Sequence, residues 1–258
     1  MKPTAVLVGV CIPALAYAIN LFSPALYNVR LGFRWKFIDG PESGLKDITF
    51  PVNMAKTSRE QGYYLSQQFS FHGVRRQGHI AIQPRPDNSK GQAMLRANFT
   101  SHQAGTATCH PACQAGPGRG GAEGSRDGVT CAIDVPADYA HTFNLTVENV
   151  RDANTWRGLL VDTVTRKTHE IGVWTLPTGA GDIQRSRFGF VEYIHQPGSR
   201  GGCENYPKLE ATVYHPWSNS AGAGELHNVG SMDLGLCGKN IFKKIKVTNG
   251  FTVYYGRG

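Results

Sequence analysis

The sequence predicts an all-β protein, a two-sheet antiparallel β-sandwich of the jelly-roll or lectin-like kind that is stapled by disulfides. Alternating apolar and polar residues recur from end to end of the chain, and no stretch shows the period of a long amphipathic helix. Glycine (31) and proline (14) are well represented, and charged residues make up only 18%. This composition favours short strands joined by turns.

The strands are predicted where the alternation is clearest. Residues 29–37, 63–71 and 188–194 each show it, and so does the stretch QGHIAIQPRPD at 77–87. Residues 156–163 and 169–176 predict a hairpin around Val164 to Lys167. Residues 242–255 predict another, because Asn249-Gly250 between two alternating runs is a strong hairpin signal.

The first 18 residues have the three parts of a secretory signal. Lys2 supplies the basic part, an apolar run follows, and Ala16-Tyr17-Ala18 fits a cleavage site. The run is too short and too broken to span a bilayer. We therefore expect cleavage after Ala18, a secreted, extracellular single domain over residues 19–258, and no membrane span.

The formal net charge is +8. A basic balance can indicate a nucleic-acid partner, but a secreted chain without a dense Lys/Arg cluster does not favour one. The longest basic feature, Lys243-Lys244 with Lys246, predicts the edge of a sheet, where lysine discourages aggregation. Attraction to anionic cell-wall glycans is the other interpretation of this charge.

Five cysteines remain after Cys11 leaves with the signal, so two disulfides and one free thiol are expected. Cys203 and Cys237 flank one segment and are expected to pair. Cys131 has two candidate partners, Cys109 and Cys113, and Cys113 is slightly favoured. Cys109-His110-x-x-Cys113 is also a candidate zinc site, but no second ligand pair follows at zinc spacing. The sequence therefore predicts no metal and no cofactor.

Two glycosylation sequons begin at Asn98 and Asn144. Each asparagine alternates with apolar neighbours and is expected to point away from the core. If the source is a eukaryote, we expect both to carry glycans.

The 77–87 strand sets His79, Gln83 and Arg85 on one side, opposite two isoleucines. Pairing with the 63–71 strand would join them to Tyr64 and its polar neighbours in one surface. That surface is either the solvated side of a sheet or a sugar-binding platform.

Glu192 lies on the same side of its predicted strand as Phe188 and Phe190. A carboxylate among aromatic residues needs a partner, because burying it alone is costly. It either pairs with an arginine or opens onto a surface where aromatic rings stack on sugars. Tyr193 and His195 are further candidate ligand-binding residues there.

An enzyme would need more than Glu192. Glycoside hydrolysis uses two carboxylates about 5 to 10 Å apart. A polysaccharide lyase needs a base and a group that neutralises the uronate, which His79, Tyr193, His195, Gln83 and Arg85 offer. The candidates for a second carboxylate are Asp134, Asp162, Glu170 and Asp182.

Several motifs resemble an uncharacterised family of secreted microbial and fungal proteins, known as a domain of unknown function. They are Y-Y-x-S-x-Q-F-S-F at 63–71, G-H-I-A-I-Q-P-R-P-D at 78–87, G-V-T-C at 128–131, W-R-G-L-L-V-D-T-V-T at 156–165, H-E-I-G-V-W-T-L-P at 169–177 and G-F-V-E-Y at 189–193. The resemblance covers roughly residues 60–215 and leaves out the C-terminal hairpin at 240–256. It implies a secreted, β-rich domain and brings no activity or catalytic residues.

The leading hypothesis from sequence is a secreted lectin-like protein whose partner is an extracellular glycan or polysaccharide of a cell wall or host. A polysaccharide-cleaving lyase or glycoside hydrolase on the same scaffold is one alternative. A secreted effector that binds a protein partner is another.

Overall fold

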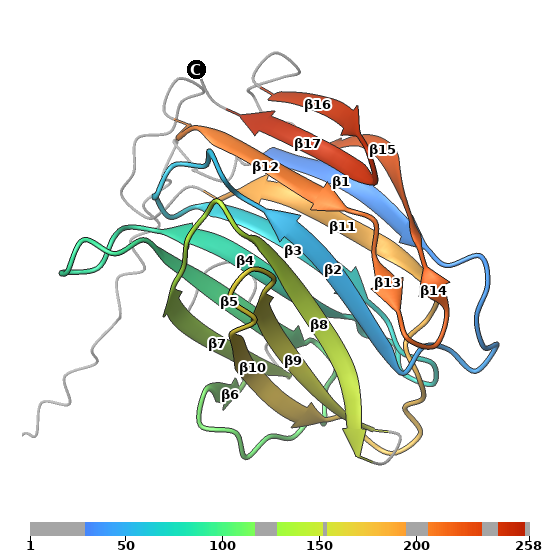
Figure 1. Cartoon of the computed structure of the whole chain (residues 1–258). Coiled ribbons are helices and arrows are strands. Elements are labelled where there is room, and N and C mark those ends of the chain that lie inside the picture. Colours follow the sequence, from blue (N-terminus) through green and yellow to red (C-terminus); the bar gives the residue numbers. More distant parts are fainter. Residues whose placement is uncertain (1–28, 117–127, 152–153, 195–205, 234–241, 256–258) are drawn as a thin grey trace, which may run out of the picture.

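The computed structural model describes residues 29–116, 128–151, 154–194, 206–233 and 242–255. In these ranges it contains strands and turns and no helix, so none of them has a helix that could cross a membrane (Figure 1). The predicted signal at 1–18, the predicted site residue His195 and the predicted pair Cys203 and Cys237 lie outside the described residues.

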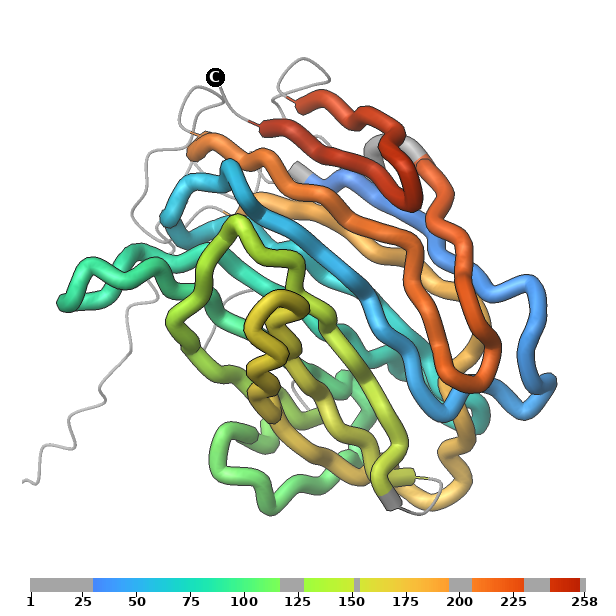
Figure 2. The backbone as a smooth tube through the Cα atoms, viewed as in Figure 1, coloured from blue at the N-terminus to red at the C-terminus, as the bar shows by residue number. Residues whose placement is uncertain are grey.

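The first sheet has eight strands. In spatial order they are β15 (Glu225–Asp233), β1 (Val29–Lys36), β11 (Ser186–Tyr193), β3 (Tyr63–Phe69), β4 (Gly78–Arg85), β5 (Met94–Ser101), β7 (Val129–Pro136) and β6 (Cys113–Ala115). Each strand is antiparallel to its neighbours. The first described strand, β1, lies beside the late strand β15 in this sheet, although the two are far apart in the sequence (Figure 2).

The second sheet has nine strands. Seven follow one another in the order β10 (Thr168–Thr175), β9 (Thr155–Asp162), β8 (Thr142–Arg151), β2 (Asp47–Asn53), β12 (Leu209–Tyr214), β17 (Gly250–Tyr255) and β16 (Phe242–Val247). The short strands β13 (Trp217–Ser218) and β14 (Gly222–Ala223) are added beside β2. The lysines of β16 lie on the last strand of this order, as their spacing predicts.

The two sheets pack face to face around one aromatic core. Trp35 of the first sheet contacts Phe50 of the second at 5.5 Å between ring centroids. Further along, Phe99 stacks on Trp174 at 4.5 Å. All four side chains are buried. The predicted two-sheet antiparallel β-sandwich is therefore confirmed.

Both predicted hairpins are present. β9 and β10 pair around the turn at Val164 to Lys167. In the second hairpin the turn falls one residue earlier than the Asn249-Gly250 signal indicates, because Gly250 already pairs with Val247. Asn249 adopts the positive φ of 61° that this turn requires, a conformation that asparagine tolerates better than most residues.

One predicted disulfide is present, between Cys113 and Cys131. It joins the short strand β6 to β7 and leaves Cys109 as an exposed free thiol. Because Cys113 is used in the disulfide, the alternative zinc site does not form; the described residues contain no cluster of three or more metal-binding side chains. Gly172 of β10 packs directly on both sulfur atoms, and a Cβ there would collide with them.

Candidate functional site

The eight-stranded sheet carries a set of polar side chains on the side that faces away from the core. Side chains alternate along a strand, so each strand turns one set to the core and the other set to this side. We call the second set the polar face. It comprises Tyr64, Ser66 and Gln68 of β3, His79, Ala81, Gln83 and Arg85 of β4, Arg96, Asn98 and Thr100 of β5, and Phe190 and Glu192 of β11.

The register of the strands sets these residues in lines across the sheet. Glu192 pairs with Tyr64, and Gln83 pairs with Arg96, which in turn pairs with Asp134. The register of β3 and β4, continued by one residue, sets Tyr64 opposite Gln83. The prediction that the polar rows of the two neighbouring strands form one surface is confirmed.

The middle of the polar face is buried. Ser66 is 0% exposed, Gln83 is 1% exposed and His79 is 4% exposed. Asn98 of β5 and Arg85, at the end of β4, are half-buried. The interpretation of this row as a simply solvated surface is therefore wrong. Alternation indicates which side of a strand a residue faces, but not what covers that side.

Several buried polar atoms of this face make no hydrogen bond within the described structure. They are Ser66 Oγ, Gln83 Nε2, Arg85 Nε, Asn98 Oδ1 and Thr100 Oγ1. Buried polar groups in proteins nearly always have a partner, and leaving one without costs about 1–3 kcal/mol. The polar face thus contains both donors and acceptors that are buried and make no hydrogen bond within the described residues.

Glu192 pairs with an arginine. Arg30 Nε donates to Glu192 Oε2 at 2.7 Å from the neighbouring strand β1. The same guanidinium lies 4.3 Å from the centroid of the Phe190 ring. One oxygen of Glu192 is therefore committed to Arg30, as the first of the two sequence interpretations expects.

His79 contacts a second histidine. Its Nδ1 lies 3.0 Å from Nε2 of His102, and the centroids of the two rings are 5.1 Å apart. One of these nitrogens must donate and the other accept, so at most one ring is protonated on both nitrogens without losing this bond. His79 is therefore one member of a contacting histidine pair.

Arg85 and Gln83 bond to each other beside the ion pair of Arg96 and Asp134. Arg85 Nη2 donates to Gln83 Oε1 at 3.0 Å, and Arg85 Nη1 donates to Gln61 Oε1 at 3.1 Å. Arg96 binds Asp134 through two hydrogen bonds of 2.9 and 2.5 Å. Asp134 Oδ1 is 3.9 Å from Arg85 Nε, too far for a hydrogen bond.

Tyr193 does not join this set. It lies on the other side of β11, 4.8 Å from Tyr63 and 4.9 Å from Tyr206 between ring centroids, inside the core. The sequence predicts that Tyr193 binds ligand beside Glu192. Its side chain points to the opposite side of the sheet, as consecutive residues of a strand do.

The candidate second carboxylates are not positioned to act with Glu192. Asp134 shares its face, but four strand spacings separate them, or about 19 Å. That exceeds the separation of about 5 to 10 Å that glycoside hydrolysis uses. Asp182 is bound to Lys46 at 2.7 Å, while Asp162 and Glu170 belong to the other sheet.

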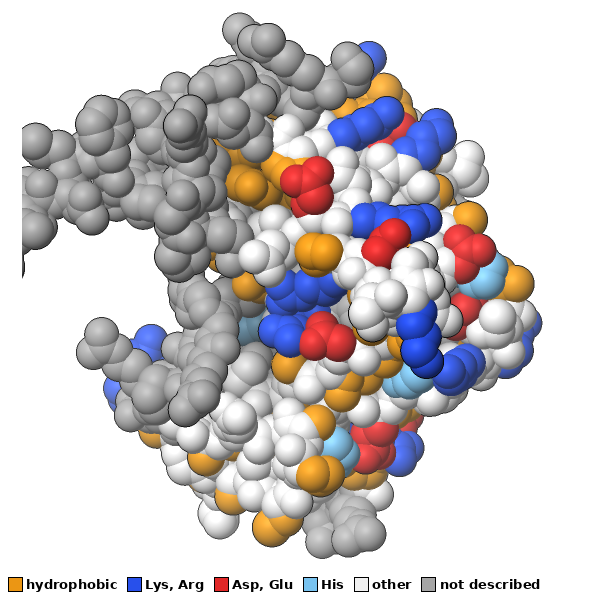
Figure 3. Space-filling model, turned by 90° about the vertical axis from the view of Figure 1, so that its left-hand side faces the viewer, with side chains coloured by type: hydrophobic (Ala, Val, Ile, Leu, Met, Phe, Trp, Pro, Cys, Tyr) orange, Lys and Arg blue, Asp and Glu red, His pale blue; other side chains and the backbone are white. Residues whose placement is uncertain are grey.

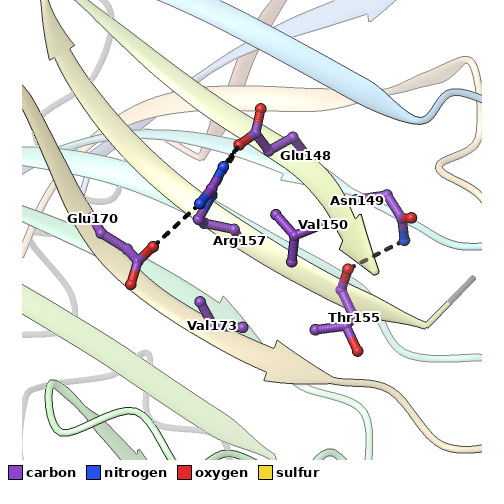
Figure 4. A pocket seen from close by; sticks show the side chains of 7 residues that line it. All are labelled: Glu148, Asn149, Val150, Thr155, Arg157, Glu170 and Val173. Carbon is purple, nitrogen blue, oxygen red and sulfur yellow. Dashed lines mark hydrogen bonds and ion pairs between the residues drawn. The ribbon is translucent and has the colours of Figure 1, made fainter. Parts of the chain in front are cut away.

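The structure also shows a pocket that the sequence analysis missed. It lies on the outer side of the second sheet, has a volume of about 650 Å³, and contains Arg157 between two carboxylates (Figure 4). Arg157 Nε donates to Glu148 Oε1 at 2.9 Å, and its Nη1 lies 3.6 Å from Glu170 Oε2. In the sequence this pocket is indicated only by charged residues on the outer side of three successive strands, and such residues are common on any solvated sheet.

A second pocket of about 360 Å³ adjoins the first through Thr155 and Val173 and contains Cys109 and His110. His110 Nε2 lies 3.1 Å from Glu170, while its Nδ1 accepts a hydrogen bond from the Ala112 N–H at 3.2 Å. Nε2 therefore carries the proton, and His110 is not arranged as a base for the Cys109 thiol.

Comparison with known proteins carries no argument about this chain. No protein-family model and no curated protein matches this chain. Among solved structures, scytalido-glutamic peptidase with a transition-state analogue inhibitor aligns with a TM-score of 0.46 and 6% identity, covering 88% of this chain and 99% of that one. SCP-B, of the eqolisin family of peptidases, in a complex with the tripeptide Ala-Ile-His aligns with a TM-score of 0.39 and 10% identity, over 88% and 98%.

A third structure is the CBM2 module of the evolved Dit protein of Lactobacillus casei BL23 phage J-1. It aligns with a TM-score of 0.29 and 11% identity, over 63% of this chain and 69% of that one. Likenesses at this level carry no argument about what this chain binds or catalyses. The site itself must support any functional conclusion.

Proposed function

We propose that this chain is a secreted carbohydrate-binding protein and that the polar face is its binding surface. The observation that carries the proposal is the group of buried hydroxyl and amide atoms without a hydrogen bond, on Ser66, Gln83, Asn98 and Thr100. A sugar hydroxyl both donates and accepts hydrogen bonds, so one ligand can serve amide donors and amide acceptors together.

The aromatic residues of the same face support this proposal. Tyr64 lies between Glu192 and Gln83, and Phe190 of β11 lies opposite Ser66. Sugar recognition combines an apolar ring against C–H faces with polar groups against hydroxyls, which is the mixture that these side chains supply. The partner we propose is an extracellular glycan or polysaccharide.

An extracellular location is part of the proposal. The Cys113–Cys131 disulfide supports it, since such bonds persist in oxidising compartments. The signal-like residues 1–18 support it as well.

The sharpest test uses two threonines in a matched pair. Thr100 Oγ1 is buried without a hydrogen bond, whereas Thr146 Oγ1, in the other sheet, bonds Thr49 Oγ1 at 2.9 Å. In protein made in bacteria, where the sequons that end at Thr100 and Thr146 carry no glycan, Thr100→Val removes a hydroxyl that makes no hydrogen bond within the described residues. We expect it to raise the Tm and to weaken glycan binding at least fivefold. Thr146→Val breaks an internal bond and should lower the Tm without changing binding.

Binding is measured on a glycan array and then by calorimetry with the oligosaccharides that bind. Polysaccharide digestion is followed in parallel. Release of reducing ends or unsaturated products would make the chain an enzyme and contradict a purely binding role. An array without signal, together with capture of a specific protein partner, would contradict the proposal altogether.

A further inference from the structure

We propose that the glycan carries an anionic oxygen group, a carboxylate or a sulfate ester, and that Arg85 and Gln83 bind it. This inference rests on the proposed function and names the class of glycan. It begins with the guanidinium of Arg85, whose two terminal nitrogens already donate to Gln61 and Gln83. Its remaining nitrogen, Nε, is buried and makes no hydrogen bond.

Gln83, which Arg85 already contacts, adds a second donor without a hydrogen bond. Its Oε1 accepts from Arg85 Nη2, and this bond fixes the orientation of the amide. Its Nε2 is therefore identified as the donor, and that atom is buried without a hydrogen bond in a side chain that is 1% exposed. Two donors without an acceptor, on two side chains that contact each other, match the two oxygens of an anion better than they match a neutral hydroxyl.

Among the described residues, Arg85 and Arg96 carry two positive charges and Asp134 carries one negative charge, so one positive charge is not neutralised. Arg96 and Asp134 neutralise each other through two hydrogen bonds, and the Arg85 Nε approaches Asp134 no closer than 3.9 Å. Burial, and then the charge of Arg96, lower the pKa of Arg85 below its ordinary value. A half-buried cation beside another cation gains from an added anion, and the net positive charge of the chain attracts such a ligand from a distance.

The test compares three oligosaccharides of equal length by calorimetry at physiological ionic strength. They are an oligogalacturonide, its fully methyl-esterified form, and a sulfated galactan fragment. We expect wild type to bind at least one of the two acidic ligands tenfold or more tightly than the neutral ester. A preference for the first assigns the anion to a carboxylate, and a preference for the third assigns it to a sulfate ester.

Two variants locate the anion, with a third as matched control. Arg85→Gln should remove the acidic preference. Arg59→Gln removes the same charge from an exposed arginine bound to Asp87 at 3.0 Å, and should leave the preference within twofold of wild type. Gln83→Glu supplies a carboxylate from the protein itself, so it should raise the Tm and abolish the preference for acidic ligands. This last readout remains available if Arg85→Gln fails to fold.

The outcomes separate this inference from the proposed function. Equal affinity for the acidic and neutral ligands overturns the anion site but leaves carbohydrate binding intact. Equal losses in Arg85→Gln and Arg59→Gln overturn it as well, because attraction would then be only long-range. Absence of binding to any glycan on the array or in calorimetry overturns both.

Discussion

Arg30 and Glu192 form an ion pair across two neighbouring strands whose partners differ in exposure. The Arg30 side chain is 43% exposed, whereas that of Glu192 is 5% exposed. The two residues are 162 positions apart in the chain. The pair lies at the side of the polar face nearest β1. Because the two side chains differ in exposure, replacing Arg30 and replacing Glu192 should have different effects on stability.

Arg30→Ala should destabilise the fold more than Glu192→Gln. Removing the arginine takes away a cation that binds a buried carboxylate, at an expected cost of about 2–4 kcal/mol. The glutamine keeps the shape and frees an arginine that water already reaches, at about 1 kcal/mol. Urea unfolding of both variants gives the comparison. Equal costs would show that the charge of Glu192 is stabilised by other groups.

Gly172→Ala should cost about 1–3 kcal/mol, because its Cβ would press on the sulfur atoms of Cys113 and Cys131. Replacing both cysteines by alanine removes the bond and costs roughly 3 kcal/mol by itself. In that background the space opens, and Gly172→Ala should cost less than half as much as before. A double-mutant cycle from thermal unfolding measures this coupling. Strict additivity would mean that the glycine matters for another reason.

Acid should weaken the fold through Asp162. Desolvation raises the pKa of its carboxyl, but hydrogen bonds from His141 and from the N–H groups of Val164 and Thr165 lower it by more, to about 2. The unfolded chain, with an ordinary pKa of about 3.9, therefore binds more protons between pH 2 and 4. The stability from Asp162 is present above that range and is lost as the pH falls through it.

Asp162→Asn should accordingly flatten the dependence of unfolding free energy on pH between about 2 and 4. Unfolding curves of wild type and variant at several pH values provide the measurement. Parallel curves for the two proteins would count against the role of this carboxylate.

Glycosylation should distinguish the two sequons. Asn98 belongs to the polar face and its Oδ1 is buried, whereas Asn144 lies on the outer side of the second sheet. We expect protein secreted from a eukaryotic host to carry a glycan at Asn144 and the glycan-binding fraction to be unoccupied at Asn98. Mass spectrometry of affinity-purified protein tests this. Full occupancy of Asn98 in the binding fraction would place the binding surface elsewhere.

The sequence could predict much of the fold, because alternation depends only on the two-residue repeat of a strand. Alternation correctly predicted that Gln83 and Arg85 share one side of their strand, and that β9 and β10 form a hairpin around residues 164–167. The partner of Glu192 was not predictable, since nothing within the sequence links position 30 to position 192. The burial of Gln83 was equally hidden, because burial depends on what covers the sheet.

The claim that the polar face binds glycan is tested most directly by the side-chain amide of Gln83. In isotope-labelled protein, titration with the oligosaccharide that binds most tightly should shift the NMR resonances of this amide, with the same Kd as calorimetry gives. The amide of Asn149, in the pocket of the second sheet, serves as the reference and should not move. The claim predicts a saturable shift at Gln83 and none at Asn149. A shift at Asn149 with none at Gln83 would contradict it.

Figure 3 shows how mixed the charges are on the side of the molecule at the left of Figure 1, with basic and acidic side chains next to one another. A surface of mixed charge does not indicate where a glycan binds. The resonance of the Gln83 side-chain amide reports directly on binding at the polar face. Saturation that follows the calorimetric Kd supports glycan binding at the polar face, and a resonance that stays fixed while the glycan binds contradicts it.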